Sequence, residues 1–260
     1  MVAGDLHQPR LAAKDRFAAS AHSSGDVRET ETARAGGMRS RGSAVKLVAC
    51  HPRLRSEVSG VPMARMNLAE SLFINSAARV REMRRTIGPR VLESADSTGV
   101  RRVLEVGCGQ GVGVELILTR FTDTEVVGID LDPKMIRRAQ RRLASRRDRA
   151  EVRVGDVCSL PFEDASFDVI VDFAAVHHIP DWRAALGEIA RLLVPGGQFL
   201  FEDHDVTKHS LFARTFFAHP DERFTAAEFA SALADVGIYV DDRLDDRNGH
   251  FVGRGIKRAA

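Results

Sequence analysis

The sequence predicts an α/β fold built on a doubly wound sheet of seven strands, mostly parallel, with an antiparallel hairpin at its C-terminal end. Between residues 101 and 203, short β-rich runs alternate with helical patterns. The runs are almost continuously apolar, as expected for parallel strands that are buried on both faces. The dipeptide Asn248-Gly249 then separates two further strand patterns, and such a turn joins antiparallel neighbours. One or two helices precede the sheet.

The predicted elements follow from hydrophobic periodicity. Apolar residues recur at helical spacing from Asn67 to Ile87, and Ser76 can cap the second of two helices. The strand patterns are Arg102–Val106, Glu125–Asp130, Glu151–Val154, Phe167–Phe173, Gln198–Glu202, Ile238–Arg243 and His250–Lys257. The helical patterns of the main domain are Gly111–Phe121, Pro133–Arg146, Trp182–Leu193 and Thr225–Val236.

Three regions differ in composition. Residues 1–62 are rich in Ala, Arg, Ser and Gly and have no sustained hydrophobic period, which predicts a disordered tail. An equally good interpretation is that translation starts at Met63 or Met66. Residues 63–98 are expected to form a helical cap segment, and residues 99–260 the main domain.

Composition and charge exclude several classes of protein. The chain has 38 Lys and Arg against 36 Asp and Glu, without a dense basic face and interleaved aromatic residues, so nucleic acid is not an expected partner. No run of about 18 apolar residues is present, which excludes a transmembrane segment. Cys50, Cys108 and Cys158 lie far apart and lack metal-ligand spacing. We therefore expect a reduced, cytoplasmic protein, and its oligomeric state stays open.

A glycine-rich turn follows the first strand, where the segment Glu105–Gly111 has the pattern acid-x-Gly-x-Gly-x-Gly. Glycines at such a turn let the backbone pass close to a ligand that any Cβ would touch. The spacing does not fit the dinucleotide pattern G-x-G-x-x-G, because the last position falls on Val112 or Val114. A pyrophosphate-containing cofactor is therefore disfavoured.

Acidic side chains follow the second and third strands. Asp130 ends the second strand, where a carboxylate can accept two hydrogen bonds from a ribose diol. Asp132 is better explained as a helix N-cap, with Pro133 at the first helical position. Asp156, after the third strand, can accept a hydrogen bond from an exocyclic amine such as adenine N6. A solvated aspartate in a turn explains Asp156 at least as well.

Taken together, these features resemble the class I S-adenosylmethionine-dependent methyltransferases, which have a Rossmann-like fold. The Glu105–Gly111 segment is similar to their motif I, and the resemblance extends over about Val103 to Asp203, including the turn Leu193–Gly197 before the fifth strand. Among these enzymes it is similar to the ubiquinone/menaquinone-biosynthesis C-methyltransferases and their small-molecule relatives. The resemblance implies S-adenosyl-L-methionine as cofactor. It also implies a set of cofactor-binding residues: Glu105, Gly107, Cys108, Gly109, Gly111, Asp130, Leu131, Asp156, Val157 and Phe173.

Methyl transfer needs little acid–base catalysis from the protein, because a sulfonium is already electrophilic and in-line alignment of the acceptor supplies much of the rate acceleration. If the acceptor must lose a proton, histidine has a suitable pKa. His204, after the fifth strand, is the first candidate, followed by His178 and then His177, although a structural role explains each of them as well. No metal site is expected, since the adjacent Asp203, His204 and Asp205 would seldom converge on one ion.

The predicted function is methyl transfer from S-adenosylmethionine to an O, N or C atom of a small metabolite. The acceptor is apolar if the aromatic residues of His204–Phe224 line its pocket, but an ordinary buried helix face explains them as well. Asp172-Phe173-Ala174-Ala175 stands where amino-methylating DNA enzymes carry a Pro-Pro motif, which disfavours a DNA base. Two alternatives stay open: a nicotinamide-dependent oxidoreductase, and a non-catalytic methyltransferase-like binding protein.

Overall fold

The structure is a computed structural model, and it describes residues 75–205, 224–241, 245–247 and 249–259. The predicted tail at residues 1–62 and the first part of the predicted cap segment lie outside the described residues, so both stay predictions. Within the segment His204–Phe224, the structure describes His204, Asp205 and Phe224, and Phe224 is the only described member of its aromatic set.

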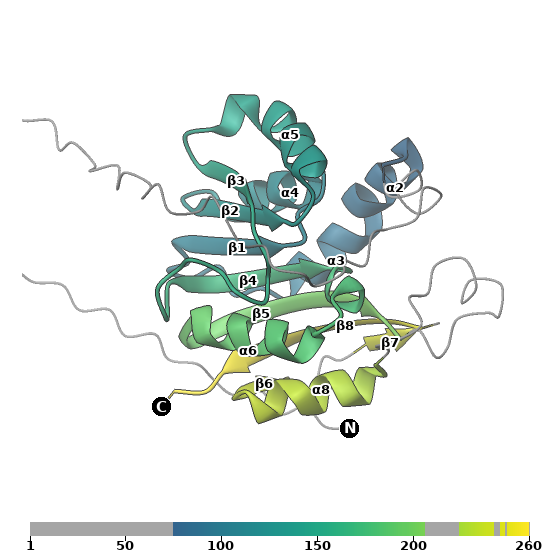
Figure 1. Cartoon of the computed structure of the whole chain (residues 1–260), viewed down its shortest axis with the longest axis vertical. Helices are drawn as coiled ribbons and strands as arrows, with labels where there is room; N and C mark the ends of the chain where they lie inside the picture. The colour runs from purple at the N-terminus through teal and green to yellow at the C-terminus, as the bar shows by residue number, and fades with distance from the viewer. Residues whose placement is uncertain (1–74, 206–223, 242–244, 248, 260) are drawn as a thin grey trace, which may run out of the picture. The chain divides into compact units, whose positions relative to one another are not determined.

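The described part of the chain is organised around one mixed sheet (Figure 1). Its strands run in the order β3-β2-β1-β4-β5-β8-β6, and the short β7 pairs with β8. Strands β1 to β5 pair in parallel, whereas β8 is antiparallel to β5, β6 and β7. The strands are β1 (Arg102–Val106), β2 (Glu125–Asp130), β3 (Ala150–Val154), β4 (Phe167–Phe173), β5 (Leu193–His204), β6 (Ile238–Val240), β7 (Asp245–Arg247) and β8 (His250–Lys257). The predicted fold class is confirmed.

Helices cover both faces of this sheet. Figure 1 shows α6 (Trp182–Leu192) and α8 (Ala226–Asp235) on one face, where Phe199, Phe201 and Phe251 pack against them. The opposite face carries α3 (Gly88–Glu93), α4 (Val112–Arg120) and α5 (Pro133–Arg142), which pack on the other side chains of the same strands. Alternate residues of each central strand thus enter different cores, which explains their almost continuous hydrophobicity. No helix among the described residues is long and apolar enough to cross a membrane.

The predicted helix cap at Ser76 is present. Its hydroxyl accepts a hydrogen bond from the backbone N–H of Arg79 at 3.1 Å, at the start of α2 (Ala77–Glu82). A π-helical turn, η1 (Met83–Ile87), connects α2 directly to α3. The second predicted helix therefore runs on to Glu93 as one interrupted helical segment.

Four strands, β1, β2, β4 and β8, have the predicted bounds, and the other differences arise from pairing. The predicted turn at Leu193–Gly197 is wrong in part, because Leu193 pairs with Phe167 and the strand β5 already begins there. A register shift follows, and Gly196 has a φ of 79° at this irregularity.

Helix α5 ends at Arg142, four residues before its predicted end, and a 3-10 turn, η2 (Ala144–Arg146), follows.

Candidate functional site

The candidate site lies at the carboxyl ends of the parallel strands. After β1 the chain continues outward to β2 and β3, and it then returns to β4 on the other side of β1. In doubly wound sheets this reversal opens a crevice beyond the strand ends, where ligands bind. The predicted cofactor residues follow β1, β2 and β3 or end β4, so the topology brings their strand ends to one edge.

The turn after β1 requires its glycines. Gly107, Gly109 and Gly111 have φ values of 65°, 51° and 83°, in the left-handed region that favours glycine. A Cβ at Gly107 would also collide with the side chain of Ala175, which follows β4. At Gly109, by contrast, a Cβ would meet no described atom within 4 Å. The turn therefore presents bare backbone to open space at Gly109.

Asp130, at the end of β2, is tied to this glycine turn. Its Oδ2 accepts a hydrogen bond from the Gly109 N–H at 2.8 Å, and its Oδ1 accepts one from the Asp132 N–H at 2.8 Å. Burial raises the pKa of the Asp130 carboxyl, and these two N–H groups oppose the rise. Each carboxyl oxygen keeps a lone pair beyond these bonds, so the side chain can accept from a ligand's hydroxyl groups as well.

Glu105 is a carboxyl group enclosed within the strand β1. It is 2% exposed, and burial, followed by the charges of Asp130 and Asp172, raises its pKa well above the ordinary value. Its Oε2 is buried without a hydrogen-bond partner among the described residues. Gly113 of α4 leaves the room for this carboxyl, because a Cβ there would collide with it. Such a group favours a cationic ligand nearby, whose charge would stabilise the ionised form.

The residues predicted at adenine occupy the ends of β2 and β3. The Gly155 N–H donates to the Asp130 carbonyl at 3.2 Å, which holds the two loops together. Asp156 is exposed, and its Oδ1 accepts from the Cys158 N–H at 2.9 Å, so its side chain also closes its own turn. Val157 is buried, whereas Leu131 is 42% exposed. An exposed apolar side chain at this edge is suited to pack against a flat ring.

Two of the residues that the resemblance assigns to the cofactor, Cys108 and Phe173, have buried side chains. Both side chains are buried in the core on the α4 face. The Cys108 backbone N–H donates to the Ile129 carbonyl at 2.8 Å, and burial raises the pKa of its thiol. Beyond Phe173, Ala174 has a φ of 61°, which is strained for a residue with a Cβ. This strained turn places Ala175 against Gly107.

Three of the histidine rings form a group with a buried aspartate. His177 Nδ1 lies 2.5 Å from Asp203 Oδ1, and the ring of His177 lies 3.9 Å from that of His178 and 4.8 Å from that of His204 between centroids. Asp203 is fully buried, and burial raises its pKa to about 8. The structure thus brings the predicted candidates His178 and His204 together, and it gives the partner carboxylate to His177, the candidate that the sequence favoured least.

Residues that sequence reasoning missed lie beside this group. Glu202 is buried, and its Oε1 lies 3.0 Å from Nδ1 of His250 in β8. The rings of His204 and His250 are 4.2 Å apart between centroids. Asp172, the other missed acid, is fully buried in β4, where burial and the neighbouring Asp203 raise its pKa well above the ordinary value. The signal available in the sequence was the presence of acids inside otherwise apolar strands.

Comparison with known proteins shows what the central part of the chain is similar to. Residues 104–201 match the family described as "Methyltransferase domain". The matched residues make up less than half of the chain, and over that segment the chain is similar to this family. A fatty-acid O-methyltransferase of Mycolicibacterium smegmatis is 38% identical over 167 residues, covering 63% of this chain and 52% of that protein. A phthiotriol/phenolphthiotriol dimycocerosates methyltransferase of Mycobacterium tuberculosis is 36% identical over 105 residues, 40% of this chain and 38% of that protein. The chain thus spans about half or less of these relatives' lengths.

Solved structures show the same fold. A S-adenosylmethionine-dependent methyltransferase from Mesorhizobium loti superimposes with a TM-score of 0.57 at 17% identity, over 65% of this chain and 96% of that one. The cyclase SpnF superimposes with a TM-score of 0.57 at 18% identity, over 66% of this chain and 80% of that one. At these identities the likeness concerns the fold alone, and the second neighbour carries a different name for its reaction.

S-adenosylmethionine is the cofactor that the methyltransferase domain implies, and the residues present fit it. The open space at Gly109 admits a ligand against bare backbone. Asp130 offers acceptors for hydroxyl groups, and the unpartnered oxygen of Glu105 suits a cationic molecule. The individual residue assignments stay predictions.

Proposed function

We propose that this chain transfers a methyl group from S-adenosylmethionine to an O, N or C atom of a small, apolar acceptor. The observation that carries the proposal is the hydrogen bond from the Gly109 N–H to Asp130, which joins the glycine turn after β1 to the carboxylate after β2. This arrangement supports a ligand with hydroxyl groups lying against bare backbone, and it lacks the glycine spacing of a dinucleotide site.

The donor, when bound, supplies an electrophilic methyl group on a sulfonium. In the proposed mechanism Asp130 accepts hydrogen bonds from the ribose hydroxyl groups, while Leu131 packs against adenine and Asp156 with Val157 recognises its edge. Glu105 lies in β1, two residues before the glycine turn, and the cationic end of the donor would stabilise the ionised form of its carboxyl group. The protein's contribution to the rate is then mainly orientation of the acceptor in line with the methyl group.

An apolar acceptor is supported by the relatives rather than by a described pocket. The two relatives reported above are named for fatty acids and for phthiotriol or phenolphthiotriol dimycocerosates. Phe224 is the described aromatic residue of the segment for which a pocket lining and an ordinary buried face were both open. It packs with Trp182 and Phe229, at 4.7 and 5.0 Å between ring centroids. For Phe224 the ordinary buried face is therefore the better interpretation.

A base is needed only if the acceptor atom must lose a proton. His204 and His178 stay the predicted candidates, and His177 joins them because Asp203 contacts its Nδ1. A carboxylate in that position orients an imidazole and stabilises its charged form.

Two titrations test the cofactor. We expect S-adenosylhomocysteine to bind the purified protein and NADH to bind far more weakly. Tight binding of NADH alone would overturn the proposal in favour of the oxidoreductase alternative.

A metabolite-extract screen with isotope-labelled donor tests the reaction, since a labelled methyl product can be detected by mass. We expect a labelled product in apolar extracts. Donor binding without turnover in any extract would favour the non-catalytic alternative, for which the cyclase neighbour is a reminder that this fold carries other chemistry. Location in the cytoplasm and the absence of a nucleic-acid substrate also stay proposals from the sequence.

A further inference from the structure

A second polar cluster, formed by Glu202, His204 and His250, lies on β5 and β8. Glu202 and His204 are two residues apart on β5, so their side chains project from the same face of the strand. His250 is paired directly with His204 across the antiparallel ladder, and paired residues also share a face. The three side chains can each offer one ligand atom, and these atoms all lie within 4.8 Å of one another.

The strand ends that carry this cluster are held by backbone bonds. The ladder between β5 and β8 continues up to the pair His204 and His250. Just beyond it, the Asp205 N–H donates to the Gly249 carbonyl at 2.7 Å. The histidines are therefore carried by a paired backbone rather than by separate loops, which favours a preorganised site.

Glu202 provides an independent sign of a ligand. Its side chain is 2% exposed, and its Oε1 contacts His250 Nδ1 at 3.0 Å. Its second oxygen, Oε2, is buried with no hydrogen-bond partner in the described part of the chain. A buried carboxylate oxygen in this state is costly unless something else satisfies it.

Two imidazoles and one carboxylate are a ligand set that divalent transition metals accept. Zn²⁺ binds histidine nitrogen and carboxylate oxygen at about 2.0–2.2 Å, which places neighbouring ligand atoms roughly 3 Å apart. The contact between His250 Nδ1 and Glu202 Oε1 already has that length. The third ligand, on His204, can approach by rotation of its ring.

We propose that Glu202, His204 and His250 bind a divalent transition-metal ion such as Zn²⁺. Three protein ligands leave at least one coordination position for water or for an oxygen of a small molecule. None of these three residues belongs to the predicted cofactor-binding set, and the proposal does not depend on methyl-transfer activity. The plainer alternative is a hydrogen-bonded pair of Glu202 with His250 that holds no ion.

Metal titration of the whole, tag-free chain after dialysis against a chelator tests this site. We expect one tight site for Zn²⁺ by calorimetry, and visible Co²⁺ absorption typical of nitrogen and oxygen ligands. His250→Ala and His204→Ala should each weaken the affinity by more than about 100-fold, since even groups that only support a metal ligand contribute about 10- to 100-fold. Glu202→Gln should do the same.

His178→Ala is the matched control, because it removes a neighbouring imidazole that is outside the proposed ligand set, and it should leave the affinity within a few-fold. If Glu202→Gln does not fold, the two histidine variants, checked by circular dichroism, decide the question. Absence of a tight site, or a tight site unaffected by His250→Ala and His204→Ala, overturns the proposal. Because neither donor nor acceptor is added, failure of the titration does not count against methyl transfer, whereas a confirmed site would leave His178 and His177 as the candidate bases.

Discussion

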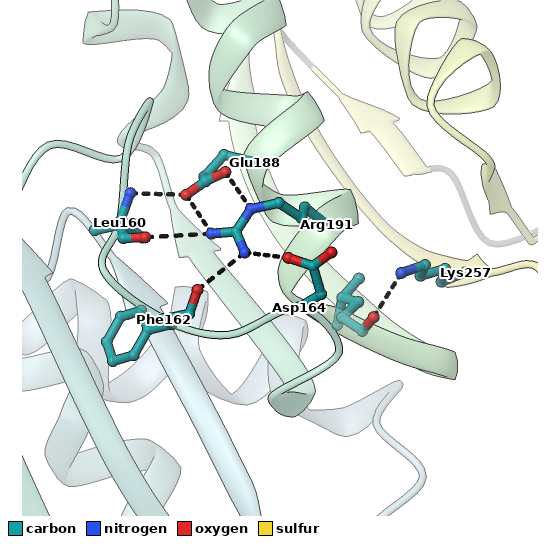
Figure 2. A network of polar contacts seen from close by, with 7 residues as sticks. Leu160, Phe162, Asp164, Glu188, Arg191 and Lys257 are labelled. Atoms are coloured by element: carbon teal, nitrogen blue, oxygen red, sulfur yellow. Dashed lines mark hydrogen bonds and ion pairs between the residues drawn. The ribbon is translucent and has the colours of Figure 1, made fainter.

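The acidic side chains around Arg191 and those at the carboxyl ends of the strands differ in how their oxygens are satisfied. Figure 2 shows the first group, in which Arg191 of α6 binds Glu188 through Nε and a terminal nitrogen, both at 2.8 Å. Arg191 also donates to Asp164 and to two backbone carbonyls, at Leu160 and Phe162. The hydrogen bonds from Arg191 hold the pKa of Glu188 below its ordinary value.

The acidic side chains at the strand ends have raised pKa values, in contrast to the lowered pKa of Glu188. Burial is the largest cause of a raised pKa at Glu105, Asp130, Asp172 and Asp203. Glu105 Oε2 and Asp172 Oδ2 are buried without hydrogen-bond partners among the residues that the structure describes. Buried acidic groups that lower the stability of the free protein and converge at one edge are typical of binding sites. The acidic side chains around Arg191, by contrast, join α6 to the connection before β4.

Asp130→Ala should have the largest effect of the variants, and it tests whether the acids at the strand ends serve binding. Two charge-assisted hydrogen bonds to a ribose diol would be lost, so the affinity for S-adenosylhomocysteine should fall by about 100-fold or more. Calorimetric titration measures the change. Asp132→Ala is the matched control from the same connection: it removes the cap of α5, costing about 1 kcal/mol of stability, and should leave the affinity within a few-fold. Equal losses in both variants would contradict the assignment of Asp130.

Arg191→Ala should act on stability alone. The partly exposed guanidinium satisfies two carboxylates and two backbone carbonyls, and its loss should reduce the free energy of unfolding by about 2 kcal/mol. Urea denaturation measures this change, and donor affinity should remain that of the parent protein. If the donor affinity fell as well, the network in Figure 2 would contribute to binding, and the distinction between a stabilising and a binding group of acids would be wrong.

Glu105→Gln should change how stability depends on pH. Because the folded state raises the pKa of Glu105, it retains a proton that the unfolded chain releases. Stability is therefore highest below the unfolded pKa and falls as pH rises towards the folded pKa, by up to about 1.4 kcal/mol per pH unit for one group. The facing groups Asp130, Asp172 and Cys108 remain in both proteins. Urea denaturation between pH 5 and 7 should thus give a shallower fall for the variant, and parallel curves would count against a raised pKa.

Local sequence patterns account for much of the fold and for the predicted cofactor residues. Strands β1 and β2 are mostly apolar; β1 ends at Val106, directly before Gly107, and β2 ends at Asp130. Both ends can be recognised without knowing any partner strand. Adjacent parallel strands then place these ends together, and the hydrogen bond between Gly109 and Asp130 agrees with the expectation that these residues lie at one edge of the sheet.

Features that depend on pairing between distant segments were not predictable in this way. His250 meets Glu202 only because β8 inserts beside β5 in one particular register, across 48 residues of sequence. The early start of β5 likewise depends on Leu193 pairing with Phe167. A one-residue change of either register would move these side chains to other partners or to the other face.

Asp164→Ala should have the smallest effect, and it tests whether the Arg191 group depends on its buried or its exposed contacts. The Asp164 side chain is 79% exposed, whereas that of Glu188 is 12% exposed. Exposed ion pairs contribute about 0–1 kcal/mol, so the free energy of unfolding should change by less than about 0.5 kcal/mol. Glu188→Ala is the matched comparison and should cost more, because it also removes the acceptor of the Leu160 N–H at 2.7 Å. If the two variants were equally destabilised, the stabilisation would come from the total charge around Arg191 rather than from the buried hydrogen bonds.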